Sequence, residues 1–77
     1  MKELVEVIAK ALVDSPDEVV VSQREEDDGT IVIELHVAKE DMGKVIGKKG
    51  RIAKSIRTVV KTAAQKQNLK TVVDIID

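Results

Sequence analysis

The feature that most constrains the fold of this chain is a short loop, bounded by two glycines and tipped by two lysines, between two apolar stretches. Its residues are Gly47, Lys48, Lys49 and Gly50. The apolar pair 45–46 precedes the loop, and Ile52 and Ile56 follow it at a spacing of i and i+4. This pattern predicts one helix that ends at Gly47 and a second helix that begins at Gly50. Two helix ends therefore meet at a basic turn.

The predicted turn has the properties of an anion-binding site. Glycine at both corners allows positive φ and lets a ligand approach the backbone without meeting a Cβ. The free N–H groups that open the second helix point toward the same space as Lys48, Lys49 and Arg51. Because two glycines at this spacing often occur by chance, the interpretation depends on the flanking helices as well. A phosphate group suits this site.

The net charge is −1, but the charges are strongly segregated along the sequence. Residues 1–38 contain 3 basic and 10 acidic side chains, whereas residues 39–70 contain 10 basic and 2 acidic side chains. If the charged residues only formed solvated helix faces, basic and acidic side chains would usually be mixed along the sequence. Local potential, more than net charge, attracts a polyanion, so the segregation indicates an electrostatic binding face in the second half of the chain.

The first half of the chain predicts a helix followed by a β-hairpin. Apolar residues recur at helical spacing over 2–14, and Pro16 ends the helix because proline cannot donate to a helical ladder. Residues 18–25 and 30–37 predict two strands joined by an Asp28-Gly29 turn, the second strand with strict apolar alternation. This alternation indicates a sheet covered on one face only. The acidic residues at the turn lack the ligand spacing of a calcium loop and predict a solvated turn.

The second half predicts a short helix over 40–46, a long helix over 51–66 and a last strand over 71–76. A strand–helix–helix–strand crossover most simply makes this strand parallel to residues 30–37. On the long helix, apolar residues fall within one arc of about 140°, wide enough to pack on a sheet. They are Ile52, Ala53, Ile56, Val59, Val60, Ala63 and Ala64. A basic stripe beside them comprises Lys54, Arg57 and Lys61.

The motif between Ile46 and Ile56, an Ile-Gly-x-x-Gly sequence with basic residues at both x positions, resembles the signature of the KH domain. KH domains clamp the backbone of about four nucleotides with such a loop. The flanking elements resemble the prokaryotic type II arrangement, and a chain of this size resembles the small bacterial KhpA-type RNA-binding proteins. The resemblance implies an α+β fold, one KH domain over 1–77 with the order α-β-β-α-α-β and three helices on one face of a three-stranded sheet.

The resemblance also implies which residues contact RNA. One of Val45 and Ile46 belongs to the core, and the other lines an aliphatic groove for bases. Gly43 costs about 1 kcal/mol relative to alanine in a helix, which indicates close approach of either a nucleotide backbone or a packed helix. The expected RNA-binding residues are Gly43, Lys44, Val45, Ile46, Gly47, Lys48, Lys49, Gly50, Arg51, Lys54 and Arg57.

No metal, cofactor or catalytic activity is expected. His36 is the single histidine, cysteine is absent, and the serines lack a local nucleophile motif. No apolar run exceeds three residues, so the sequence predicts neither a signal peptide nor a membrane span, and we expect a cytoplasmic location.

The expected ligand is single-stranded RNA, with single-stranded DNA as a second ligand. The chain has no Phe, Tyr or Trp, so it cannot stack bases on the aromatic platforms that RRM, OB and cold-shock modules use. Because one KH domain grips few nucleotides, useful affinity requires a second domain. The resemblance implies self-association and pairing with a larger, multidomain KH protein of the KhpB type. Ser55, Thr58 and Thr62 on the long helix are the candidate interface.

Two alternatives to an RNA-binding regulator or RNA chaperone stay open from the sequence. A helix-turn-helix DNA reader also joins two helices through a short turn that contains glycine. It would need base-reading side chains at the start of its second helix, where this chain offers only Arg51 and Lys54. An adaptor with the KH shape that binds proteins would be expected to have lost the loop lysines.

Overall fold

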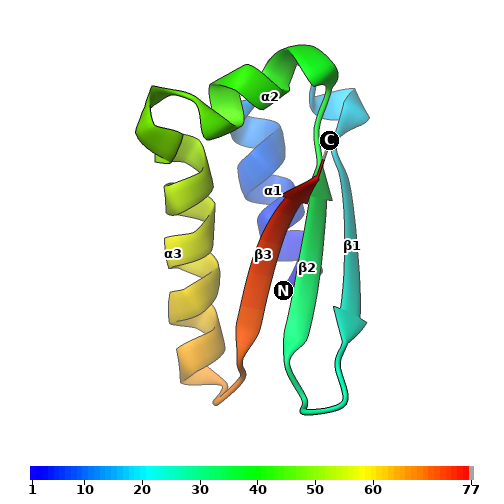
Figure 1. The fold of residues 1–77 in the computed structure, drawn as a ribbon, viewed down its shortest axis with the longest axis vertical. Helices are drawn as coiled ribbons and strands as arrows, with labels where there is room; N and C mark the ends of the chain where they lie inside the picture. The colour runs from blue at the N-terminus through cyan, green and yellow to red at the C-terminus, as the bar shows by residue number, and fades with distance from the viewer. Residues whose placement is uncertain (77) are drawn as a thin grey trace.

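The computed structural model describes residues 1–76, except for the side chain of Lys48 (Figure 1). The last residue, Asp77, lies outside this description. In chain order the elements are α1 (Lys2–Leu12), η1 (Pro16–Glu18), β1 (Val20–Glu25), β2 (Ile31–His36), α2 (Lys39–Ile46), η2 (Lys48–Gly50), α3 (Arg51–Lys66) and β3 (Thr71–Ile76), where η denotes a short 3-10 turn. The helices and strands follow the predicted order.

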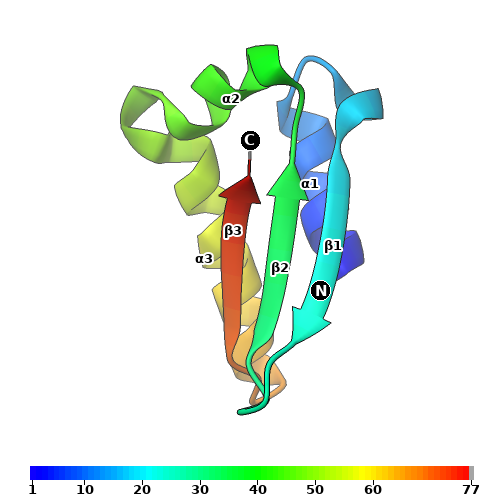
Figure 2. The ribbon, with the colours of Figure 1, turned by 45° about the vertical axis from the view of Figure 1, so that its right-hand side comes forward.

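The three strands form one mixed sheet in the order β1-β2-β3. β1 pairs with β2 in antiparallel register, as the Asp28-Gly29 turn predicts, and β2 pairs with β3 in parallel register, with Ile33 opposite Val73. The helices lie on one face of this sheet, and none of the described helices covers the other face (Figure 2). The predicted α+β architecture is therefore confirmed.

The hydrophobic core lies between the sheet and the helices. Ile31, Ile33 and Leu35 enter it from β2 at the predicted alternation. Each buried side chain of this size contributes roughly 1.5–3 kcal/mol to stability. The number of buried residues differs between helices: α3 buries Ala53, Ile56, Val60 and Ala64, whereas α2 buries Asp41 and Val45. Val45 is therefore the one fully buried apolar side chain of α2, and Met42 is half-buried.

Several predicted element boundaries are wrong by one or two residues. The first helix ends at Leu12 and not at residue 14, because Val13 already has an extended backbone with φ −103° and ψ 162°. Pro16 opens η1, so β1 begins at Val20 and not at residue 18. The second strand covers 31–36 instead of 30–37, and α2 begins one residue early, at Lys39.

Two side chains differ in burial from the sequence prediction. Val59 was predicted within the buried arc of α3, but it is 40% exposed because the helix packs along a narrower stripe. Val32 lies on the outward face of β2, yet it is only 3% exposed. The register places Arg24 and Val72 on either side of Val32, and their side chains shield it.

None of the described helices combines the length and hydrophobicity needed to cross a bilayer.

Candidate nucleic-acid interface

The glycine-bounded loop lies where α2 and α3 meet, at one end of the molecule (Figures 1 and 2). α2 ends at Ile46, Gly47 is its C-cap, and the 3-10 turn η2 leads directly into α3 at Arg51. The Gly50 N–H donates to the Gly47 carbonyl oxygen at 2.9 Å, which closes the turn. The predicted junction of two helix ends is present, and α3 covers the predicted range 51–66 with Gly50 as its N-cap.

The two glycines serve different purposes. Gly50 has φ 67° and ψ 29°, the left-handed conformation that glycine adopts without strain. Gly47 has φ −79° and ψ −176°, so the prediction of positive φ at both glycines is wrong. A Cβ at Gly47 would overlap the carbonyl oxygen of Gly43 one turn earlier, and this overlap explains the glycine. Close packing of the backbone against itself requires Gly47.

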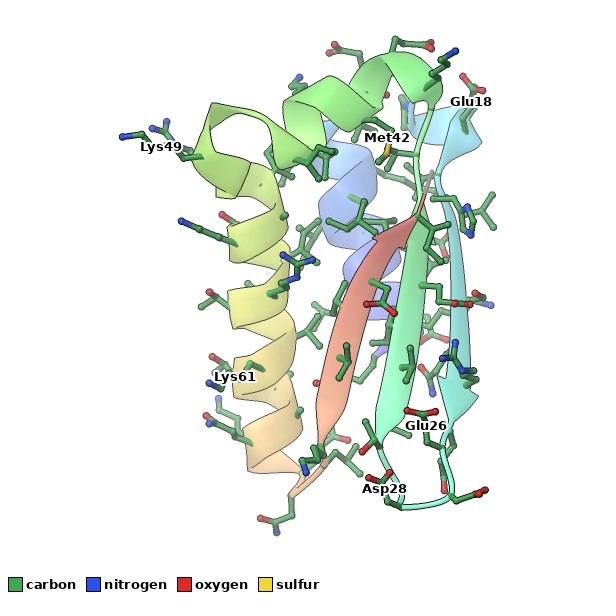
Figure 3. The ribbon with its side chains drawn as sticks, viewed as in Figure 1. Glu18, Glu26, Asp28, Met42, Lys49 and Lys61 are labelled. Carbon is green, nitrogen blue, oxygen red and sulfur yellow. The ribbon has the colours of Figure 1, made fainter. Side chains whose placement is uncertain are left out.

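The second positive φ of the loop belongs to Lys49, a residue with a side chain. Its backbone has φ 63° and ψ 24°. A left-handed conformation costs a non-glycine residue about 1–2 kcal/mol, and such strain is concentrated at functional sites. Lys49 is exposed, and Figure 3 shows its side chain pointing away from the molecule at the loop tip. The loop holds a lysine in solvent at a cost in stability.

The N-terminus of α3 opens beside this lysine. Its N-cap is Gly50, which makes no side-chain cap, and its first turn carries no acidic residue. The first N–H groups of a helix carry partial positive charge and bind anions when no cap occupies them. Arg51 and Lys54 are exposed on the first turn of this helix. The site therefore combines uncapped helix N–H groups with three described cations; the side chain of Lys48, the fourth expected cation, lies outside the described residues.

α2 presents a small exposed patch next to the loop. Ile46 is 54% exposed, whereas Val45 is fully buried, so Ile46 is the one of this pair that can line a groove. Gly43 is exposed, and a Cβ built there would have no neighbour within 4 Å. Tight helix packing at Gly43 is therefore wrong as an explanation, and open space for a ligand remains. Lys44 forms an exposed ion pair with Asp14, with 3.2 Å between Nζ and Oδ1.

A groove of about 480 Å³ lies between α3 and β3. Its lining includes the apolar residues Val60, Ala64 and Val73 and the basic residues Arg57, Lys61 and Lys70. Arg57 reaches across it, since its Nε donates to the Val73 carbonyl oxygen at 3.3 Å. Figure 3 shows Lys61 on the same side of α3 as Lys49. A basic surface thus continues from the loop along α3.

Lys61 and Lys70 line the groove but lie outside the set of site residues that the sequence predicts. Lys61 belongs to the basic stripe of α3 together with Lys54 and Arg57. This stripe is the sequence signal that indicates Lys61 as a further site residue. Lys70 reaches the groove only because β3 lies parallel to β2 and returns beside α3. Its charge alone gives no indication of that position.

The order of elements, the mixed sheet and the glycine-bounded loop between two helices define a KH domain of type II. A family model described as "KhpA/KhpB, KH domain" matches residues 2–75. The chain therefore belongs to the bacterial KhpA/KhpB family of KH domains. This family is non-catalytic, as the sequence predicts.

Several similar proteins carry the name "RNA-binding protein KhpA". The protein from Clostridium acetobutylicum is 63% identical over 76 residues, which cover 99% of this chain and 100% of the relative. The protein from Listeria monocytogenes is 49% identical over 77 residues, with 100% of both chains covered. The protein from Treponema pallidum is 45% identical over 76 residues, 99% of this chain and 94% of the relative. No solved structure matches the chain significantly.

Proposed function

We propose that this protein is a non-catalytic, cytoplasmic RNA-binding protein that holds the backbone of single-stranded RNA with the loop from Gly47 to Gly50. The observation that carries the proposal is the uncapped N-terminus of α3 beside the exposed cations Lys49 and Arg51. Relatives over the whole chain are named as RNA-binding proteins, which supports RNA as the ligand. Single-stranded DNA presents the same phosphates and is a second ligand for this loop.

The RNA strand continues from the loop over the groove between α3 and β3. Phosphates face the exposed Lys54 on the first turn of α3 and then Lys61 at the groove, and bases lie on the apolar floor between the two elements. Ile46 and the open backbone at Gly43 extend this surface on the side of α2. The contacts are aliphatic because the chain contains no aromatic side chain. Bases are therefore held by shape and by hydrogen bonds at their edges, and not by stacking.

Self-association complements this small site. The outer face of α3 carries Ser55, Thr58 and Thr62, together with the exposed Val59. Ser55 Oγ donates to the Arg51 carbonyl oxygen and Thr62 Oγ1 to the Thr58 carbonyl oxygen, both at 2.9 Å. Because the Ser55 and Thr62 hydroxyl groups donate within the helix, these two residues can pack against another helix without leaving a donor unpaired. We assign this face to a homodimer contact.

A multidomain KH protein of the KhpB type is the second proposed partner. The family model that matches this chain covers KhpA and KhpB domains together, so the two kinds of domain share one fold. Two linked or associated KH domains bind one RNA with avidity, which compensates for the weak grip of each domain. In this role the protein acts as a post-transcriptional regulator or RNA chaperone.

Titration with RNA at several salt concentrations tests the proposed function. If the site contacts about three or four phosphates, log affinity for single-stranded RNA falls against log salt with a slope of roughly −2 to −3. Duplex DNA of the same length is the comparison ligand. Preference for duplex DNA would indicate a helix-turn-helix mode, and absence of binding to any nucleic acid would indicate a protein-binding adaptor. Either result would contradict the proposal.

A further inference from the structure

Asp41, in the first turn of α2, is the one charged side chain that is buried among the described residues, with 1% of its surface exposed. A buried carboxylate loses its hydration and requires hydrogen bonds in compensation. Oδ1 accepts a hydrogen bond from the Asp14 backbone N–H at 3.1 Å, and Oδ2 accepts one from the Ser15 backbone N–H at 3.0 Å. Both oxygens therefore tie α2 to the segment that links α1 to η1.

α2 has little else to hold it in place. It is 8 residues long, and a helix of this length is marginal without tertiary contacts. Gly43 lowers its helix propensity further. Its buried residues are Asp41 and Val45, one turn apart on the same face. With Met42 only half-buried, the position of α2 depends mainly on one polar anchor, Asp41, and one apolar anchor, Val45.

The two anchors constrain α2 in different ways. Burial of Val45 is non-directional, so it keeps the helix against the core but permits rotation about the helix axis. The two hydrogen bonds of Asp41 are directional and fix both rotation and distance. The Lys44–Asp14 ion pair links the same two segments at the surface, where such a pair contributes little. A well-packed apolar residue often stabilises a core at least as well as a buried charge, so orientation is the specific contribution of Asp41.

We propose that Asp41 is a positioning residue for RNA binding: it sets the rotation of α2 and thereby the approach of Gly47 to the N-terminus of α3. The inference rests on the proposed function, in which the loop from Gly47 to Gly50 binds RNA. Rotation of α2 would displace Gly43 and Ile46 and tilt the loop away from the helix N–H groups. Asp41 itself is buried and touches no ligand.

The test variant is Asp41→Asn, which keeps the size of the side chain but turns one acceptor into an NH₂ group that faces a backbone N–H. We expect RNA affinity to fall by about tenfold, because the binding-competent orientation of α2 would then be populated in only about a tenth of the molecules. Amide hydrogen exchange should accelerate in residues 42–50 beyond the rest of the chain, because the loosened helix opens locally. Asp14→Asn removes only the exposed ion pair and should leave RNA affinity within about twofold of wild type.

Ile33→Val, a core change in β2, is the stability control. It should lower the melting temperature with a uniform rise in exchange and leave RNA affinity within about twofold. The inference is wrong if, in both Asp41→Asn and Ile33→Val, the loss of RNA affinity is proportional to the fall in melting temperature and amide exchange rises uniformly along the chain. Asp41 would then be merely structural. If Asp41→Asn does not fold, Asp41→Glu replaces it; wild-type exchange and affinity in that variant would also overturn the inference. If wild type binds no RNA, the proposed function fails, and local acceleration in 42–50 alone decides the role of Asp41.

Discussion

The molecule contains two tight turns of opposite character, the acidic hairpin turn between β1 and β2 and the basic loop between α2 and α3. The hairpin turn satisfies its own polar groups. Glu26 N–H donates to the Thr30 carbonyl oxygen at 2.8 Å, and Gly29 N–H donates to the Glu26 carbonyl oxygen at 2.9 Å. The Thr30 N–H donates to Asp28 Oδ1 at 2.9 Å, and this bond holds the pKa of Asp28 below its ordinary value. The turn is complete without a ligand.

The loop between the helices is built in the opposite way. The α3 N-terminus has no side-chain cap, and of the two left-handed positions in the loop one is occupied by Gly50 and the other, under strain, by Lys49. In the hairpin turn the left-handed position, with φ 88°, is taken by Gly29. Figure 3 shows Glu26 and Asp28 at the end of the molecule opposite Lys49. The hairpin turn, which serves the fold, pairs its polar groups with one another. The loop between the helices, which serves a ligand, leaves N–H groups and positive charge available.

Alanine at one glycine of each turn should produce the largest contrast. Gly47→Ala forces a Cβ into the backbone carbonyl of Gly43, which should cost about 1–3 kcal/mol of stability and abolish RNA binding. Gly29→Ala places a Cβ in open space at positive φ, so it should cost about 1–2 kcal/mol and leave RNA affinity unchanged. Thermal melts and RNA titrations of both variants measure this contrast. Equal RNA binding by the two variants would remove the distinction between the turns.

Lys49→Gly should separate stability from function within the basic loop. Glycine relieves the left-handed strain, and we expect stability to rise by about 0.5–1 kcal/mol while RNA affinity falls by about threefold to tenfold. Lys49→Ala is the matched control because it removes the charge but keeps the strain. It should lose the same affinity without gaining stability. If Lys49 contributed only to the fold, Lys49→Gly would instead lower stability and leave RNA binding unchanged.

The smallest effect is expected at Asp28. Because its pKa is lowered in the folded protein, its ionised carboxylate contributes stability above the ordinary value of 3.8, and this contribution is lost as pH falls through the folded pKa. In Asp28→Asn the free energy of unfolding should fall slightly less steeply as the pH is lowered into the acid range. RNA affinity at neutral pH should be unchanged. Urea unfolding between acid and neutral pH measures the change. A marked fall in RNA affinity would mean that the hairpin turn takes part in binding.

The fold follows from the sequence because its signals are periodic. Alternation over 31–36 and helical spacing over 51–66 each specify one buried face, and the structure buries those faces. Val59 is an exception, because the stripe that α3 buries is narrower than the apolar arc of its sequence. The width of that stripe depends on the elements packed against the helix, which the pattern of a single helix does not specify.

The site was less predictable, for two physical reasons. Backbone angles are set by the closure of the whole junction, so the sequence could not show that Lys49, and not Gly47, takes the positive φ. The partners of Asp41 are the backbone N–H groups of Asp14 and Ser15, and a backbone donor has no sequence signature. From the sequence, Asp41 is only an acidic residue near a helix N-terminus. The assignment of RNA contacts to individual residues stays a prediction.

The double variant Lys48→Asp/Lys49→Asp tests the central claim most directly. Aspartate tolerates the left-handed conformation at Lys49 better than most residues, so the fold should be retained within about 0.5–1 kcal/mol. Lys2→Asp/Lys39→Asp, at two exposed lysines outside the proposed interface, is the control with the same change in net charge. We expect the loop variant to lose at least about thirtyfold in affinity for single-stranded RNA at matched salt, and the control to lose less than about threefold. A loop variant that melts like wild type and still binds RNA within about threefold would contradict the account.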